Sequence, residues 1–520
     1  MGGERPKPKP SLFDITFIIW AVSIPIGFGH RLLSSDGDLA RHLRLGEVML
    51  ARRAFLRLDD FSHTAAGKAF LAFEWGSEVI YALAARLAGL AGVAVLAGLV
   101  LALAFALLGR FVVRQGGDPF LAYLLSMAAA VLSAAHWLAR PHLFTLLAVL
   151  VLMHLLARRE PAPLWPFLPL FAIWANLHGG FSYGFILIAA FAAGDLLEAW
   201  QAPDRAPWLV SAKRRALALG LAVLGSLLNP YSLALLAHVG GFFGRDAILR
   251  QTQEFMSPDF QTINGKLFLL ALLAVIAALA LCRRRPPWAW LLVILGNTAM
   301  ALISQRNIEL FALTALPLAA LHVDREWRSL RWLRRPREVF EREHRGVYGG
   351  VAAAIVAGLL VVVAAIGGRL AGIELVPNRF SETAFPVKLA DRARAAGVAG
   401  PIFNQFTWGG YLLYAWPEQR VFIDGGTDHY GERLFNQYIQ VWNLDPGWRD
   451  ILRQWKVEWV LVDPRSRLAT ELVQEPAPGW GVWGCDSIAV LLQRNHGIAD
   501  SSAAALSACI PRPPKPRHGG

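Results

Sequence analysis

The chain has 520 residues, of which 55% are hydrophobic and only 17% charged, and its formal net charge is +13 at pH 7. Soluble globular proteins carry about a quarter charged residues, so this composition excludes disordered, fibrous and ordinary cytosolic classes and favours a multi-spanning membrane protein. The three cysteines, Cys282, Cys485 and Cys509, stand far apart without a CxxC pair, which indicates neither a zinc site nor a disulfide framework.

Apolar segments near the roughly 20 residues needed to cross a bilayer recur along the chain. A basic leader, residues 1–11, precedes the first one, and we interpret that segment as an uncleaved anchor because no small-residue cleavage site follows it. The segment 74–90 is short and polar at its start, so we interpret it as peripheral or re-entrant. The pattern predicts a polytopic α-helical membrane protein with about 11 transmembrane helices (roughly 10–13) within residues 12–368. The predicted spans are 12–33, 91–113, 119–139, 142–157, 164–178, 181–200, 213–228, 266–282, 287–303, 308–322 and 347–367.

The arginines and lysines gather in alternate loops between these spans. Arg110 and Arg114, Arg158 and Arg159, and the run Arg325 to Arg345 all fall on one side. Basic loops stay in the cytoplasm, which predicts a cytoplasmic N-terminus and an extracytoplasmic region after about residue 370. The basic run therefore indicates contact with anionic membrane lipids, and no nucleic acid partner is expected.

Unusual polar clusters fall at span ends on the side opposite the basic loops. They are Asp36-Gly37-Asp38, Phe73-Glu74-Trp75, Arg140-Pro141-His142, Asn176-Leu177-His178-Gly179-Gly180, Asn229-Pro230-Tyr231 and Gln305-Arg306-Asn307. Ionisable groups at membrane depth are costly, so a converging set is a functional-site hypothesis. Turn formation is the alternative, and it accounts less well for Arg140 and Arg306, which oppose the positive-inside pattern.

The first external loop, 34–75, contains a predicted amphipathic helix after Asp38, lying along the membrane interface. Asp36 or Asp38 would cap this helix, and Asp38 and His42 share one face of it. The same acidic pair beside His42 also suits a general base or a divalent cation site for Mg or Mn. Both interpretations remain open at this point.

The last part of the chain changes character. Short apolar strands at 402–403, 421–423, 457–462 and 488–492 alternate with helical stretches and predict an extracytoplasmic α/β domain over 369–496. The tail, 497–520, is rich in Ala, Ser and Pro, which is typical of a disordered segment.

Two glycine-rich motifs lie in this domain, Trp408-Gly409-Gly410-Tyr411 and the segment from Asp424 to Tyr430. One interpretation is that they bind a saccharide or cover the membrane site. The other is that they are turns with a tryptophan packed in a small core. We favour the second, because loops at strand ends are polar whatever they do.

The external acidic pair with its amphipathic helix, Glu74-Trp75, and a span reaching an external Arg140 together resemble GT-C-type membrane glycosyltransferases. These include protein O-mannosyltransferases, lipid A aminoarabinose transferases and Rgt-like transferases. The topological resemblance covers roughly residues 12–325, and the remaining motifs resemble a bacterial branch of that group. In contrast to its relatives, whose acidic residues are usually adjacent, this chain separates the pair by Gly37, which leaves open which aspartate is equivalent.

The resemblance implies transfer of a sugar from a polyprenyl-phosphate donor to a glycan, lipid or protein acceptor of the cell envelope at the extracytoplasmic face. Asp36 or Asp38 would be the base or bind a metal, with Glu74 as a second acidic candidate and His42 beside the pair. Arg140 and Arg306 would clamp the donor phosphate, and His142 and His178 would donate hydrogen bonds to it.

Two other functions fit the sequence less well. A non-enzymatic transporter or flippase of a lipid-linked or anionic solute often has inverted repeats and broken helices at mid-membrane, and we find no such repeat. An envelope-assembly scaffold would leave the polar clusters far apart from one another.

Overall fold

The computed structural model describes residues 10–158, 162–242, 253–327, 338, 350–475, 479–494 and 502–510. Most of the basic leader and of the Arg325–Arg345 run lies outside these residues. Contacts divide the chain into two compact units. The helical unit contains Met1–Leu32, Phe73–Ser77 and Ala84–Asn378, and the α/β unit contains Leu33–Ala72, Glu78–Leu83 and Arg379–Gly520.

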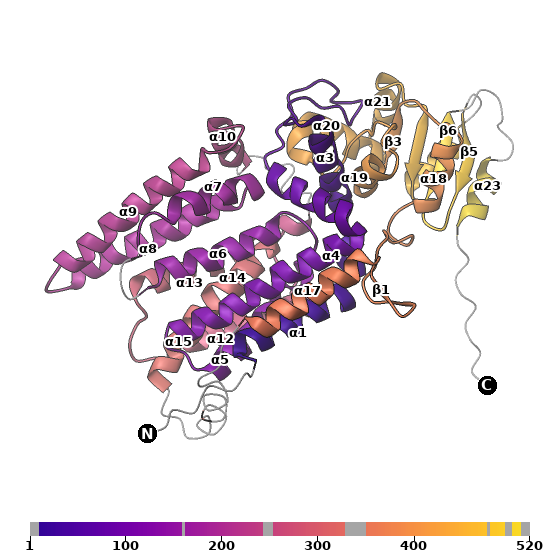
Figure 1. Ribbon diagram of the computed structural model, residues 1–520. Coiled ribbons are helices and arrows are strands. Elements are labelled where there is room, and N and C mark those ends of the chain that lie inside the picture. Colours follow the sequence, from indigo (N-terminus) through magenta and orange to yellow (C-terminus); the bar gives the residue numbers. More distant parts are fainter. Residues whose placement is uncertain are drawn as a thin grey trace. The chain divides into compact units, whose positions relative to one another are not determined.

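The helical unit consists of long apolar helices (Figure 1). They are α1 (Leu12–Gly27), α4 (Trp75–Arg114), α5 (Pro119–Ser133), α6 (His142–Leu156), α7 (Phe167–Leu177), α8 (Phe181–Gln201), α9 (Ala206–Ser226), α10 (Leu233–Phe242), α12 (Ile263–Leu281), α13 (Trp288–Ile303), α14 (Ile308–Leu313), α15 (Ala315–Trp327) and α17 (Val351–Ala365). Shorter elements are α2 (Gly29–Ser34), η1 (Ala134–His136), η2 (Gln253–Phe255), η3 (Gln305–Asn307) and the antiparallel pair β1 (Arg369–Leu370) and β2 (Ile373–Glu374).

Within the described residues, 5 helices are long and apolar enough to cross a membrane, and further apolar helices are shorter. Each predicted span overlaps a helix given above, so helices at these places are confirmed, but the span 308–322 is divided between α14 and α15 and the span 91–113 is only the second part of α4. The segment 74–90 forms the first part of α4, which breaks at Ala88 and Gly89. Gly89 has φ of 62° and ψ of −162°, a conformation that is essentially restricted to glycine, which accounts for a break at this point.

The helices of this unit pack closely where side chains are small. A Cβ on Gly194 of α8 would lie 2.4 Å from the backbone of Ala289 of α13, so the two helices meet without an intervening side chain. At the start of α1, the Asp14 carboxylate accepts hydrogen bonds from the backbone N–H groups of Gly350 and Ala353, at 2.8 and 3.0 Å. These bonds satisfy N–H groups at the start of α17 that its own helix leaves unpaired.

The α/β unit contains a four-stranded sheet of order β3-β4-β6-β5. Strands β3 and β4 are parallel, and the other neighbours are antiparallel. Its elements are α3 (Asp38–Arg52), α18 (Val387–Ala395), β3 (Ile402–Asn404), α19 (Phe406–Ala415), α20 (Thr427–Asn443), α21 (Trp448–Gln454), β4 (Trp459–Val462), α22 (Arg467–Val473), β5 (Trp480–Cys485), β6 (Val490–Arg494) and α23 (Ser502–Cys509). An α/β architecture was predicted for this region, but the strand β5 was not.

The predicted strand 421–423 is wrong as a member of the sheet. Val421 forms an isolated parallel bridge with Ser62 of the first external loop, supported by bonds from His63 N–H to the Val421 carbonyl and from Val421 N–H to the Phe61 carbonyl. This segment is buried and apolar like a strand, but its backbone pairs with the loop. The loop that the sequence groups with the membrane domain is thus folded with the C-terminal residues.

A disulfide joins Cys485 at the end of β5 to Cys509 at the end of α23. The sequence indicated no disulfide, so that prediction is wrong. The helix α23 also lies within the segment that the sequence predicts to be disordered, and the bond ties it to the sheet. The composition of this Ala- and Ser-rich segment does not favour an ordered structure, but the covalent cross-link restricts its conformations.

Replacing Cys509 by serine is expected to destabilise the α/β unit by about 3 kcal/mol, because a disulfide across 24 positions constrains the unfolded chain. The urea midpoint of tryptophan fluorescence in detergent measures this loss. Cys282→Ser is the matched control, since Cys282 is not in a disulfide. Equal midpoints for the two variants would contradict the stabilising role of the bond.

Candidate functional site

The acidic pair lies at the start of helix α3 in the α/β unit. The helix begins at Asp38, which confirms the predicted helix, and Gly37 occupies the N-cap position without a side-chain bond. Asp36 Oδ1 accepts a hydrogen bond from the backbone N–H of Asp38 at 3.0 Å. The capping prediction is therefore right in part, because Asp36 satisfies a first-turn N–H from one position before the cap. The helix dipole favours both negative charges here.

Helix α3 packs against helix α19 through glycines. A Cβ on Gly37 would lie 2.5 Å from the carbonyl oxygen of Thr407, and one on Gly410 would lie 2.2 Å from that of Gly37. These distances leave no room for a side chain, so the two backbones are in direct contact. The Trp408–Tyr411 motif is therefore part of a helix rather than a turn, with Trp408 buried as the packing interpretation predicted.

The second glycine motif lies against Asp38. A Cβ on Gly425 would lie 1.7 Å from Oδ1 of Asp38, so the carboxylate occupies the space beside the Gly425 backbone. The φ of Gly425 is not in the left-handed region, and space alone requires glycine at this position. The segment from Asp424 onward thus limits where the Asp38 carboxylate can lie.

An ion pair between Arg41 and Asp424 also joins helix α3 to the second glycine motif. The Arg41 Nε lies 3.1 Å from Oδ1 of Asp424, whose carboxylate also accepts hydrogen bonds from the Gly426 N–H at 2.7 Å and the Tyr430 hydroxyl at 2.9 Å. Burial raises the pKa of Asp424 although Arg41 opposes the shift. Burial alone would lower the pKa of Arg41, but the surrounding carboxylates, Asp424 first, raise it above its ordinary value. The ion pair and the hydrogen bonds to Asp424 hold both side chains in one orientation.

Asp59 holds the later part of the first external loop in place through hydrogen bonds. Its carboxylate accepts bonds from the Ser62 hydroxyl at 2.6 Å and the Phe61 N–H at 2.7 Å, and lies 3.0 Å from Nε2 of His429. Burial alone would raise the pKa of Asp59, but the hydrogen bonds from His429 and Ser62 outweigh it and lower the pKa. These contacts hold the loop on the start of α20.

His42 contacts Glu78. Its Nδ1 lies 3.2 Å from Oε1 of Glu78, a residue of α4, and both side chains are buried. Glu78 is a residue that sequence reasoning missed. The role of His42 as a secondary acid, base or metal ligand stays a prediction.

In the helical unit, Glu74 and His178 lie together. His178 Nδ1 accepts from the Gly180 N–H at 3.0 Å, so its proton is on Nε2, which lies 3.5 Å from Oε1 of Glu74. The Trp75 indole N–H donates to the Asn176 side chain at 2.5 Å. The Phe73-Glu74-Trp75 cluster and the Asn176–Gly180 cluster are therefore adjacent, as a converging set of polar groups requires.

Arg140 and Arg306 meet at the element η2. Arg140 Nη1 donates to Oε1 of Glu254 at 3.0 Å, and the Arg306 guanidinium lies over the ring of Phe255, 5.4 Å from its centroid. The Ser304 hydroxyl donates to the Glu254 carbonyl at 3.1 Å. Residues before α6, before α14 and within η2 thus form one cluster.

His142 belongs to the same cluster. Its Nε2 lies 3.0 Å from the carbonyl oxygen of His136 and donates to it, which leaves Nδ1 for other partners. Arg140, Arg306 and His178 all lie within electrostatic range of its ring. The structure therefore brings together the four predicted phosphate-binding residues of the helical unit.

Sequence reasoning missed two carboxylates in this cluster. Glu254 pairs with Arg140, and Glu309 is buried within electrostatic range of Arg306, Glu254 and Arg140. Neither belongs to a conspicuous motif. The signal that would have found them is a carboxylate at or near a predicted span end on the side that lacks basic loops.

Metal binding has a limited basis in these residues. No group of three or more His, Cys, Asp or Glu side chains that could hold a metal ion occurs in the part of the chain that the structure describes. The acidic pair alone does not supply the oxygen ligands that Mg²⁺ or Mn²⁺ takes. A requirement for a divalent cation stays a prediction, and no step below passes through one.

The structure is similar to the oligosaccharyltransferase AglB from Archaeoglobus fulgidus. The apo form has a TM-score of 0.53 at 12% identity over 87% of this chain and 69% of that chain. The complex with an inhibitory peptide and a dolichol-phosphate has a TM-score of 0.55 at 13% identity over the same shares. The form tethered to an acceptor peptide with the NVT sequon has a TM-score of 0.52 at 14% identity over 87% and 68%.

No family model and no curated protein matches the sequence. The structural likeness shows that the chain has the fold of a GT-C-type glycosyltransferase, so the resemblance seen in the sequence is confirmed at the level of fold. The apolar helices and these membrane-protein neighbours indicate a membrane protein with a small sheet domain.

Proposed function

We propose that this chain is an integral-membrane glycosyltransferase that moves a sugar from a polyprenyl-phosphate donor to an acceptor of the cell envelope. One observation carries the proposal: the fold is similar to that of AglB over 87% of the chain, and AglB has been solved in complex with a dolichol-phosphate. Dolichol-phosphate is a polyprenyl-type lipid phosphate, which is the donor class that the sequence resemblance implies.

The acidic pair supplies the base in this proposal. Asp38, or Asp36 beside it, removes the proton of an acceptor hydroxyl as that oxygen attacks the anomeric carbon of the sugar. The bond between the anomeric carbon and the phosphate oxygen breaks, and the lipid phosphate leaves with the bonding electrons. A carboxylate fixed by Gly425 and by the turn at Asp36 loses little entropy when it acts.

The arginine cluster stabilises the leaving group in this proposal. Arg140 and Arg306 provide guanidinium groups, which suit the geometry and charge of a phosphate. Glu254 neutralises part of the charge of Arg140 before the donor arrives, so the phosphate competes with a carboxylate for this arginine. His142 lies within electrostatic range of both arginines, but its Nε2 N–H is bound to the His136 carbonyl, so it would have to leave that carbonyl to donate to the phosphate.

The disulfide supports an extracytoplasmic position of the α/β unit. Disulfides persist in oxidising compartments and are rare in the cytoplasm, and this unit contains Cys485–Cys509. The positive-inside pattern favours the same side for residues after about 370. We propose a multi-pass protein of a bacterial inner membrane with this unit outside.

Replacing Arg306 or Arg140 by glutamine is expected to raise the KM for a synthetic polyprenyl-phosphate sugar roughly 10- to 100-fold, because each variant loses charge-assisted hydrogen bonds to the phosphate. Transfer of radiolabelled sugar by protein reconstituted in liposomes measures KM and kcat.

Arg205→Gln is the matched control, because Arg205 is an exposed arginine of a basic loop and lies outside the cluster. An unchanged KM in both cluster variants would contradict the phosphate-binding assignment. Movement of the labelled lipid across the bilayer without sugar transfer would favour the flippase alternative and overturn the proposed function.

A further inference from the structure

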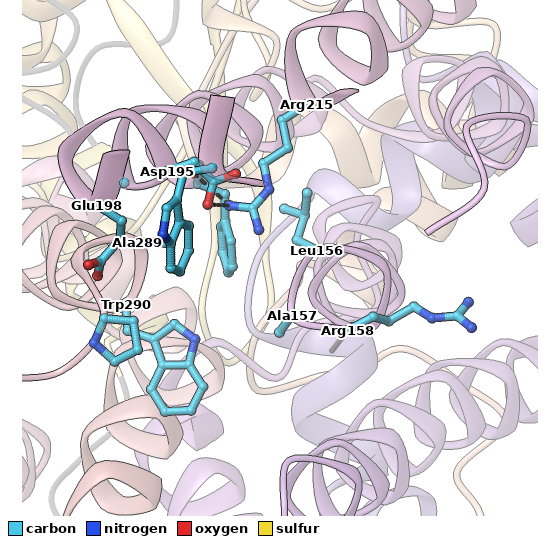
Figure 2. A pocket seen from close by; sticks show the side chains of 12 residues that line it. Leu156, Ala157, Arg158, Asp195, Glu198, Arg215, Ala289 and Trp290 are labelled. Carbon is cyan, nitrogen blue, oxygen red and sulfur yellow. Dashed lines mark hydrogen bonds and ion pairs between the residues drawn. The ribbon is translucent and has the colours of Figure 1, made fainter. Parts of the chain in front are cut away.

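A second polar site lies in the helical unit, away from the Arg140 cluster. A cavity of about 120 Å³ lies where α6 ends, between parts of α8, α9 and α13 (Figure 2). Arg158 follows α6 and lines the cavity, whereas Arg140 precedes α6. A helix of 15 residues separates the two arginines by about 22 Å along its axis, so the cavity is distinct from the proposed donor site.

Asp195 of α8 is the polar group that the cavity leaves unsatisfied. Its Oδ1 lies 3.2 Å from Nη1 of Arg215, but its Oδ2 is buried and has no hydrogen-bond partner among the described residues. Ser211 also lies near this carboxylate. The residue is only 3% exposed, so leaving this oxygen without a donor is costly. The arrangement calls for a ligand that donates a hydrogen bond.

The charges around the cavity balance. Its lining contains two cations, Arg158 and Arg215, and two carboxylates, Asp195 and Glu198. Glu198 is already bound by both terminal nitrogens of Arg285, at 3.0 Å each. Figure 2 shows Asp195 and Arg215 pointing toward each other, and the Arg158 side chain extending away from them. A ligand with both a positive and a negative group fits this lining better than an anion alone.

Aromatic rings supply the remaining walls. Phe191, Trp208 and Trp290 line the cavity, and aromatic faces attract ammonium groups. One face of Phe191 is already covered by Arg215, and one face of Trp290 by Arg325. A cavity needs roughly 10–15 Å³ to hold one water, so a volume of about 120 Å³ admits a ligand larger than a single water. Trp208 is also 38% exposed, at the rim where an apolar tail would leave the cavity.

We propose that this cavity binds the head group of a phospholipid with a primary amine, of the phosphoethanolamine type. The ammonium donates to Asp195 Oδ2 and lies against the rings, the phosphate lies toward Arg158, and the acyl chains extend into the bilayer. A quaternary ammonium has no N–H, so it cannot satisfy Asp195. The site therefore distinguishes phosphatidylethanolamine from phosphatidylcholine. This inference is independent of the proposed transferase activity.

Native mass spectrometry of the full-length protein tests the proposal, with phosphatidylethanolamine, phosphatidylcholine and phosphatidylglycerol of identical acyl chains supplied in turn. The wild-type protein is expected to retain phosphatidylethanolamine roughly tenfold better than phosphatidylcholine, because only the former donates to the carboxylate. Asp195→Asn keeps the shape of the side chain but can present an amide donor to the cavity, and it is expected to abolish the preference.

Asp204→Asn is the matched control, because it removes an exposed carboxylate near the same helix ends without touching the cavity, and it is expected to keep the preference. Equal retention of phosphatidylethanolamine and phosphatidylcholine by the wild type would overturn the proposal whatever the variants do. A preference for phosphatidylglycerol would overturn it in favour of an anionic ligand. Soluble phosphoethanolamine that raises the melting temperature, without retention of the lipid, would assign the cavity to a free metabolite instead.

Discussion

Replacing Asp38 by asparagine is expected to lower the kcat of sugar transfer roughly 10²- to 10⁴-fold, the usual contribution of a general base. Asparagine has the shape of aspartate, so the contact with Gly425 is kept while the basic carboxylate is lost. Asp36→Asn likewise removes the negative charge and keeps the local structure, because the amide oxygen still accepts the hydrogen bond from the Asp38 N–H. A loss of activity in either variant therefore reports the charge and not a lost helix turn.

The control for these variants is Asp60→Asn in the same loop. Asp60 is a half-exposed partner of Arg52, with their polar atoms 2.6 Å apart, and exposed pairs of this kind contribute little. Transfer assays on all variants, with the melting temperature as a check of folding, identify which aspartate is the base. Full activity in both single variants and in the double variant would exclude the acidic pair from catalysis.

The second large effect is expected at Gly425. A methyl group there would overlap Oδ1 of Asp38, so Gly425→Ala is expected to displace the carboxylate and lower kcat by about 10²-fold, the cost of a misplacement near 1 Å. The KM for the lipid donor is expected to stay unchanged, because the Arg140 cluster is not altered. Gly425 is thus a positioning residue that touches no substrate.

Gly484→Ala is the control for this variant. A Cβ on Gly484 would lie 3.2 Å from a terminal nitrogen of Arg392, a flexible side chain that can move away. Both variants add one methyl group to the α/β unit, and overpacking costs typically 1–3 kcal/mol. A parallel fall of kcat and melting temperature in both variants would mean that Gly425 acts through stability alone.

The helices could be predicted because they depend on local sequence. A bilayer requires long apolar segments, and the cost of charge at membrane depth makes Arg140 and Arg306 conspicuous in one pass along the chain. The burial of Trp408 was also predicted, although its motif lies in a helix and not in a turn. The contacts of the glycine motifs could not be predicted, since the contact of Gly410 with Gly37 joins segments far apart in sequence.

The remaining errors also come from long-range pairing. The segment 421–423 has the composition of a strand, and only its pairing with Ser62 shows that it lies outside the sheet. Cys485 and Cys509 were discounted because three cysteines gave no spacing pattern, although two of them fall in the region predicted to lie outside the cytoplasm. Where that location is predicted, two cysteines in one domain are a signal for a disulfide.

The pairing of the acidic loop with the C-terminal segment also determines when the loop can become ordered during synthesis. Thr64 donates its hydroxyl to the Phe422 carbonyl across 358 positions of chain. At ribosomal rates of about 5–20 residues per second, the loop waits roughly 20–70 seconds for its partner. A nascent or truncated chain therefore exposes Asp36 and Asp38 without the scaffold that fixes them. Under the proposed function, the base is therefore fixed only after residue 422 has been synthesised.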